Sequence, residues 1–192
     1  MRIVGILLAA GQGTRFGGDK LLAALGDGTA VGVAAARNLA TVMTEVIAVV
    51  RPEDARLIHL LAATGVAVQR CPTAWKGMGS SLAHAVQASA EADGWIVALA
   101  DMPLVRPETI RAVASALEDG AALVAPAYRG ERGHPVGFAR DYGARLAALA
   151  GDAGARDILR AERERIMLLE CDDPGVVADV DTPADLDTLG QE

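Results

Sequence analysis

A glycine-rich loop that carries two positive side chains follows the first apolar segment of this 192-residue chain. The loop runs from Ala9 to Lys20, contains four glycines and has Arg15 and Lys20 as its cations. Glycines let successive backbone N–H groups face an anion without a side chain in the way. Cations aimed at a departing pyrophosphate stabilise the transition state of a reaction that breaks a triphosphate. We interpret the loop as a triphosphate-binding loop, against the alternative that both cations are simply solvated.

Two acidic segments supply candidates for a metal site. Asp101 follows the apolar run Val97–Ala100, and Asp179 and Asp181 lie on the same side of a late extended segment. Magnesium takes carboxylate oxygens together with substrate phosphates and water, which suits Asp101. An aspartate in such a place also often caps a turn. The late pair has an alternative of its own, as charges favoured by the macrodipole of the helix that Thr182 and Pro183 begin.

A third polar segment, Lys76–Leu82, precedes a helical pattern. Small residues and hydroxyls at a helix start can hydrogen-bond a nucleobase edge or a phosphate, which makes Gly79, Ser80 and Ser81 candidates for nucleotide contacts. The ordinary role of serine at this position is an N-cap. The residues alone leave both interpretations open.

Two familiar nucleotide-binding patterns fit the loop poorly. A Walker A loop needs glycine before its lysine and Ser or Thr after it, whereas Asp19 precedes Lys20 and Leu21 follows. In a dinucleotide fingerprint the third glycine would come one residue before Gly17, and a helix would begin at once. Arg51, after the second expected strand, could meet a 2′-phosphate, so an NADP-binding oxidoreductase remains an alternative. A nucleotide-binding regulatory module without turnover is another.

The elements that position these residues alternate between strand-length apolar runs and longer helical segments as far as Pro126. This alternation predicts an α/β fold, a Rossmann-like three-layer sandwich with a mostly parallel sheet. Because ligands bind beyond the carboxyl ends of parallel strands, the loop and Asp101 should meet at one edge of that sheet. After Pro126 the rhythm changes, and we expect an antiparallel insertion at the sheet edge. One domain, 1–192, is the simplest organisation, with a nucleotide-binding half at 1–126 and an acceptor-binding half at 127–192. The expected strands are 3–9, 45–50, 66–70, 95–100, 122–126, 134–139, 165–170 and 176–180, and the expected helices are 30–41, 52–63, 78–91, 107–118, 142–149, 155–161 and 183–189.

Composition excludes several classes of protein. The chain is 52% apolar and 22% charged, which argues against disorder. A net charge of −7, from 18 basic and 25 acidic residues, argues against a nucleic-acid partner. Cys71 and Cys171 form no CxxC pair, which argues against a zinc cluster and fits a reducing cytoplasm. The first apolar run is far shorter than the roughly 20 residues of a membrane span, so we expect no membrane partner and a cytoplasmic location.

Leu8-Ala9-Ala10-Gly11-x-Gly13-x-Arg15-x-Gly17-x-x-Lys20 resembles the signature loop of the MobA-like NTP transferase superfamily, with Phe16 where that family often has Met. Leu-Ala-Asp-Met-Pro around Asp101 is similar to the family's metal-binding motif. The resemblance implies a nucleotide-diphospho-sugar transferase-like fold and catalytic roles for Arg15, Lys20 and Asp101. It also implies Mg²⁺ held by Asp101 and Asp181, with Asp179 less favoured. The implied nucleotide-binding residues are Leu8, Ala9, Ala10, Gly11, Gly13, Lys20, Gly79, Ser80 and Ser81.

Two later segments, 132–135 and 151–156, resemble those of the molybdenum cofactor cytidylyltransferases, in which this half receives a pterin acceptor. The resemblance implies acceptor-binding roles for His134, Asp152 and Arg156, although a lone histidine is more often structural and Asp152 could cap the following helix. Ala10 stands where the guanylyl branch has glycine, and its methyl group could crowd a purine, which favours CTP. The expected reaction moves CMP from CTP onto the phosphate of a molybdopterin-type acceptor and releases pyrophosphate, with a molybdoenzyme or its maturation chaperone as a further partner. GTP or another phosphorylated acceptor is the alternative.

Overall fold

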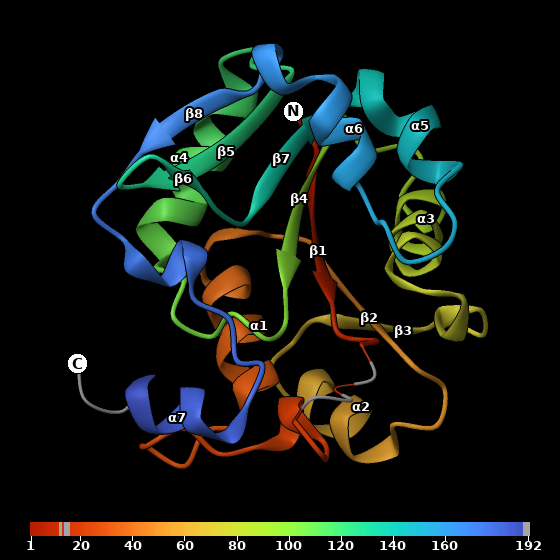
Figure 1. Cartoon of the computed structure of the whole chain (residues 1–192). Coiled ribbons are helices and arrows are strands. Elements are labelled where there is room, and N and C mark those ends of the chain that lie inside the picture. Colours follow the sequence, from red (N-terminus) through yellow and green to blue (C-terminus); the bar gives the residue numbers. More distant parts are fainter. Residues whose placement is uncertain (12, 14–15, 190–192) are drawn as a thin grey trace.

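One mixed sheet runs through the whole chain (Figure 1). The computed structural model describes residues 1–11, 13 and 16–189, with side chains as far as residue 186. The strand order is β3-β2-β1-β4-β7-β5-β6, and β8 pairs with β5 outside this path. The strands are β1 (Ile3–Leu8), β2 (Val46–Val50), β3 (Ala67–Arg70), β4 (Gly94–Leu99), β5 (Leu123–Tyr128), β6 (Glu131–Arg132), β7 (Val136–Ala139) and β8 (Met167–Glu170).

The parallel strands β3, β2, β1 and β4 lie next to one another in the sheet, and β8 forms a further parallel pair with β5. β1 pairs in parallel with β2 and β4, and β2 pairs in parallel with β3. The antiparallel part expected after Pro126 is present. β7 pairs antiparallel with β4 on one side and with β5 on the other, so it lies inside the sheet, while β6 lies at the end of the strand order.

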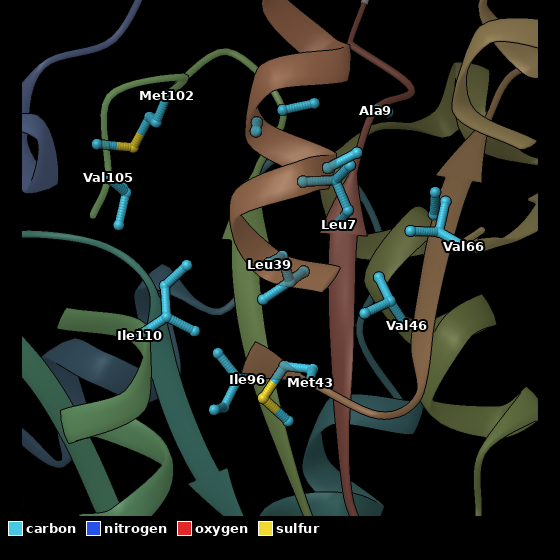
Figure 2. Packing of buried hydrophobic residues seen from close by; sticks show 14 of the residues in the cluster. Leu7, Ala9, Leu39, Met43, Val46, Val66, Ile96, Met102, Val105 and Ile110 are labelled. Atoms are coloured by element: carbon cyan, nitrogen blue, oxygen red, sulfur yellow. The ribbon is translucent and has the colours of Figure 1, made fainter. Parts of the chain in front are cut away.

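Helices cover both faces of the sheet and make the predicted three-layer sandwich. Side chains alternate between the faces along each strand, so Leu7 of β1 belongs to one buried cluster and Ile6 to the other. The first cluster holds apolar side chains from α1, α2 and α4, and Figure 2 shows Leu39, Ile96 and Ile110 within it. The second holds side chains from α3, α5 and α6. The helices are α1 (Val31–Val42), α2 (Ala55–Ala62), α3 (Met78–Ala88), α4 (Pro107–Glu118), α5 (Gly143–Ala147), α6 (Arg156–Ala161) and α7 (Pro183–Leu189).

The strand predicted at 176–180 is wrong. Pro174–Val177 forms a short 3-10 helix, η5, and extended chain without strand pairing follows it. The cause is local, because the buried carboxylate of Asp173 accepts a hydrogen bond of 3.0 Å from the N–H of Gly175 and holds the chain in a turn. Val176 and Val180 are nevertheless fully buried, which explains their apolar alternation.

The sheet brings three distant segments to one edge. Leu8 is in register with Leu99, so β1 and β4 end side by side. The N–H of Val180 donates to the carbonyl of Asp101 at 2.8 Å, which fixes the late acidic segment at the same place. In the described part of the chain no helix is both long and apolar enough to cross a membrane.

Candidate active site

Lys20 lies at the centre of the site. It begins the 3-10 helix η1 (Lys20–Leu22), and its Nζ donates to Oδ2 of Asp101 at 2.7 Å and to Oδ1 of Asp181 at 3.1 Å. Only 11% of the lysine side chain is exposed. Burial alone lowers the pKa of Lys20, but the hydrogen bonds and charges of the two aspartates outweigh it and raise this pKa above its ordinary value. The ammonium group is therefore charged at every physiological pH.

Three carboxylates converge beside this lysine. Asp101, Asp179 and Asp181 each offer an oxygen, and these oxygens lie within 4.8 Å of one another. Burial, with the charges of Asp181 and Asp101, raises the pKa of Asp179. Such a cluster of hard carboxylate oxygens suits a divalent ion such as magnesium or manganese. The structure thus brings Asp101 and Asp181 together as predicted, and it adds Asp179, which the sequence ranked lower.

Asp185 holds the late acidic segment in place. Its Oδ2 accepts from the N–H of Asp181 at 2.8 Å and from that of Thr182 at 2.6 Å, which lowers its pKa. The role of charge at the start of α7 therefore belongs to Asp185, whereas the carboxylate of Asp181 faces Lys20. The carboxylate of Asp101 likewise bonds Lys20, which is more than the turn-capping role considered for it.

A cavity of about 650 Å³ opens over this cluster. At one end it is bordered by Lys20 and Asp101, and along one wall by the glycine-rich loop, where Gly13 has a φ of +56°. Gly13 is a glycine by necessity, because a side chain disfavours that backbone conformation. Of the residues predicted to bind nucleotide, those that line the cavity are Leu8, Ala10, Gly11, Gly13, Lys20 and Ser81.

The other predicted nucleotide residues lie outside this lining. Ala9 is buried in the core cluster of the α1 face. The N–H of Gly79 donates to the carbonyl of Gly151 at 2.8 Å, so this group is already occupied. The N-cap interpretation of Ser80 and Ser81 is wrong, because α3 begins at Met78 and Gly77 is its N-cap residue.

The predicted acceptor residues are not brought together. Asp152 lines the large cavity and caps no helix, since the N-cap residue of α6 is Ala155, whose side chain makes no capping hydrogen bond. His134 borders a separate cavity of about 10 Å³, and its buried Nδ1 has no partner in the described structure. Arg156 is exposed at the start of α6.

Arg15 and Arg51 are the two other cations that the sequence offered as phosphate ligands. Arg15 lies outside the described residues. Arg51 is bound by Asp54 through two hydrogen bonds of 2.9 and 2.8 Å, beside a cavity of about 210 Å³. Its guanidinium is therefore already neutralised, which removes the main support for a 2′-phosphate site.

Sequence reasoning missed Trp75. This residue lies in the 3-10 helix η2 (Ala74–Lys76), lines the large cavity and is 70% exposed, beside Met78 at 47%. The only signal in the sequence was an aromatic residue within a polar segment of a chain with 3% aromatics.

Comparisons with known proteins show the family and the fold of the chain. Residues 5–180 match the family model of the MobA-like NTP transferase domain. Purine catabolism protein PucB of Bacillus subtilis is 28% identical over 197 residues, covering 97% of this chain and 95% of PucB. The crystal structure of Rv0371c from Mycobacterium tuberculosis is 27% identical, with a TM-score of 0.85 over 100% of this chain and 98% of that one. Its complex with manganese is 26% identical, with a TM-score of 0.84 over 100% and 99%. The sandwich therefore has the nucleotide-diphospho-sugar transferase fold, and the chain belongs to the MobA-like NTP transferase domain family and is a nucleotidyltransferase.

Proposed function

We propose that this chain is a metal-dependent cytidylyltransferase that transfers CMP from CTP to the phosphate of a molybdopterin-type acceptor and releases pyrophosphate. The observation that carries this proposal is the contact of Lys20 with Asp101 and Asp181 beneath the glycine-rich loop, at the mouth of a cavity large enough for a nucleotide. The resemblance of 132–135 and 151–156 to molybdenum cofactor cytidylyltransferases supports the acceptor, and Ala10 supports CTP. GTP or another phosphorylated acceptor remains the alternative.

The acidic cluster is the proposed cation site. Asp101 and Asp181, with Asp179 beside them, would hold Mg²⁺ or Mn²⁺, and the manganese complex of the Rv0371c structure supports this assignment. A bound divalent ion supplies Lewis acidity and neutralises phosphate charge.

Positioning and electrostatics account for what the chain itself does. The backbone of Gly11 and Gly13 borders the cavity and offers a wall without side chains for the triphosphate. Lys20 supplies a permanent positive charge beside the leaving pyrophosphate, and Arg15 is proposed to act there with it. In-line attack by an acceptor phosphate oxygen on the α-phosphorus needs no covalent enzyme intermediate. His134, Asp152 and Arg156 remain the proposed acceptor residues, in a cytoplasmic enzyme whose product passes to a molybdoenzyme or its maturation chaperone.

A nucleotide panel tests the proposal directly. Purified protein with Mg²⁺ or Mn²⁺ and molybdopterin is given CTP, GTP, ATP or UTP in turn, and pyrophosphate release and label transfer to the acceptor are measured. We expect acceptor-dependent release that is fastest with CTP. If none of the four nucleotides gives pyrophosphate release, the proposal is refuted. Faster release with GTP than with CTP would assign the guanylyl alternative.

A further inference from the structure

Apart from Lys20, Asp101 and the glycine-rich loop, one end of the large cavity is formed by the start of α3 and the segment before it. Trp75 and Met78 border the cavity there and are 70% and 47% exposed. The other tryptophan, Trp95, is 1% exposed and donates its Nε1–H to Ser89 at 2.9 Å. An exposed indole at a cavity is available for stacking on a flat ring. Removal of such a stacking contact weakens binding about tenfold or more. The ammonium of Lys76 lies over one face of the Trp75 indole, 5.4 Å from the ring centre. The opposite face of the indole is the one that a ligand would stack on.

Asp152 is held at this same end of the cavity. A Cβ built on Gly77, whose φ is +114°, would stand 2.1 Å from Oδ1 of Asp152, so the carboxylate packs directly against the N-cap of α3. The hydrogen bond from Gly79 to Gly151 joins the start of α3 to the loop that carries Asp152. Among the described residues no group donates a hydrogen bond to this carboxylate, although it lines the cavity.

The chemistry of this end differs from that of the acidic cluster and Lys20. A carboxylate at the N-cap of α3 repels phosphate, and it accepts hydrogen bonds from N–H groups. The flat indole of Trp75 and the hydrogen-bond acceptor of Asp152 line the same cavity. Together they suit a planar nitrogen heterocycle that presents amino or amide N–H donors. A ligand with an anionic tail and such a ring could place its tail near Lys20 and its ring near Trp75 and Asp152.

We infer that Trp75 and Asp152 together recognise a flat heterocycle by stacking and by accepting hydrogen bonds from its amino edge. This inference rests on the proposed nucleotidyl transfer, whose two substrates each carry such a ring. The cytosine of CTP has a 4-amino group, and a pterin has a 2-amino group beside a ring N–H. The chemistry is shared, and the experiment separates the two sources.

Tryptophan fluorescence reads the contact directly, because Trp75 is exposed and Trp95 is buried. The emission of wild-type protein is titrated with CMP and with pterin, and the Trp75→Leu variant corrects for absorption by the probe and for Trp95. Each probe is paired with an analogue that has a carbonyl in place of the amino group, UMP for CMP and lumazine for pterin. We expect saturable quenching by CMP, which assigns the site to the nucleobase, or by pterin, which assigns it to the acceptor. In either case the amino compound should bind about tenfold more tightly than its partner.

Asp152→Ala tests the carboxylate, with Asp119→Ala, an exposed aspartate at the end of α4, as the matched control. Asp152→Ala should remove the preference for the amino compound, and Asp119→Ala should keep it. The inference is overturned if neither CMP nor pterin quenches Trp75, or if both variants keep the same preference.

Pyrophosphate release by the wild type is measured in parallel. Pyrophosphate release without quenching of Trp75 overturns this inference alone. If none of the nucleotides supports pyrophosphate release, the proposed function is lost, whatever the quenching shows.

Discussion

Lys20 and the aspartates around it carry the chemistry at the scale of single residues. The lysine has two carboxylate partners at 2.7 and 3.1 Å and is largely shielded from water. In a partly buried site such contacts are much stronger than surface ion pairs, since less solvent screens them. The same lysine therefore offsets part of the negative charge of the acidic cluster.

Removal of either side of this contact should abolish most of the activity. Lys20→Ala and Asp101→Ala are each expected to lower turnover by at least about 100-fold, the scale for losing a major electrostatic contributor. Steady-state pyrophosphate release measures the effect, and Arg37→Ala and Asp119→Ala, both at exposed positions, serve as charge-matched controls. Rates close to wild type in Lys20→Ala or Asp101→Ala would remove the mechanism.

Ala10 tests the choice of base. Its methyl group is nearly buried on the wall of the large cavity, where we expect it to crowd a purine. Ala10→Gly should therefore raise kcat/KM for GTP relative to CTP. The ratio is measured with both nucleotides in competition, and a ratio equal to that of the wild type would show that the methyl group does not select the base.

His134 should make stability depend on pH. Burial lowers the pKa of His134 from 6.5 to about 4, Arg132 adds to this shift, and Asp101 and a hydrogen bond with the Val97 backbone oppose it. The unfolded chain therefore binds the proton first, and stability is lost as pH falls from about 6.5 towards 4, by about 3 kcal/mol in all. Denaturation of the wild type and His134→Gln across this range measures the difference, with the exposed His59→Gln as control. An equal loss in all three proteins would contradict the assignment.

At the scale of elements, the site lies at the ends of the strands, and hydrogen bonds between loops and helix ends fix the segments around it. The hydrogen bond of Gly79 to Gly151 joins the start of α3 to the loop before α6, and Asp173 joins η5 to α4. Neither partner was visible in the local pattern, because each contact links segments more than sixty residues apart. The apolar alternation of Val176–Val180 predicted a strand because periodicity reports burial and does not report hydrogen-bond partners.

Asp173 should be the main stabilising polar residue of this region. Its buried carboxylate accepts from the N–H of Arg106 at 2.9 Å, the hydroxyl of Thr109 at 2.6 Å and the N–H of Gly175 at 3.0 Å. Asp173→Ala leaves these donors without their acceptor, and we expect a loss of about 3 kcal/mol in the free energy of unfolding. Urea denaturation measures it. Asp172→Ala is the control, because Asp172 contributes its backbone carbonyl to Arg106, and a similar loss there would contradict this role for Asp173.

At the scale of the whole molecule, the acidic cluster ties the end of the chain to its centre. Asp101 follows β4, whereas Asp179 and Asp181 come just before α7, so the cluster closes a long loop of chain. A cation bound there should stabilise the folded protein as a unit, because the unfolded chain does not assemble the three carboxylates.

Metal binding should therefore raise the melting temperature. With Mg²⁺ or Mn²⁺ at about 100 times its Kd, linkage gives about 2.7 kcal/mol, or roughly 5–10 °C for a chain of this size. Lys20→Ala should show a larger shift, because the ammonium of Lys20 competes for Asp101 and Asp181, and Asp101→Asn should show a much smaller one. Differential scanning fluorimetry with and without EDTA makes the comparison, and equal shifts in all three proteins would place the ion elsewhere.

By itself the sequence determined the class of fold, the position of the glycine-rich loop after the first strand and the meeting of that loop with Asp101 at one edge of the sheet, because strand periodicity, glycine spacing and residue chemistry are local properties. Tertiary structure alone decided that Asp179 joins Asp181 and Asp101, that β7 lies inside the sheet, and that Trp75 and Asp152 share one cavity. These features depend on which segments meet in space. Contacts between residues far apart in the chain are set by the packing of the whole core, and a local pattern carries no record of them.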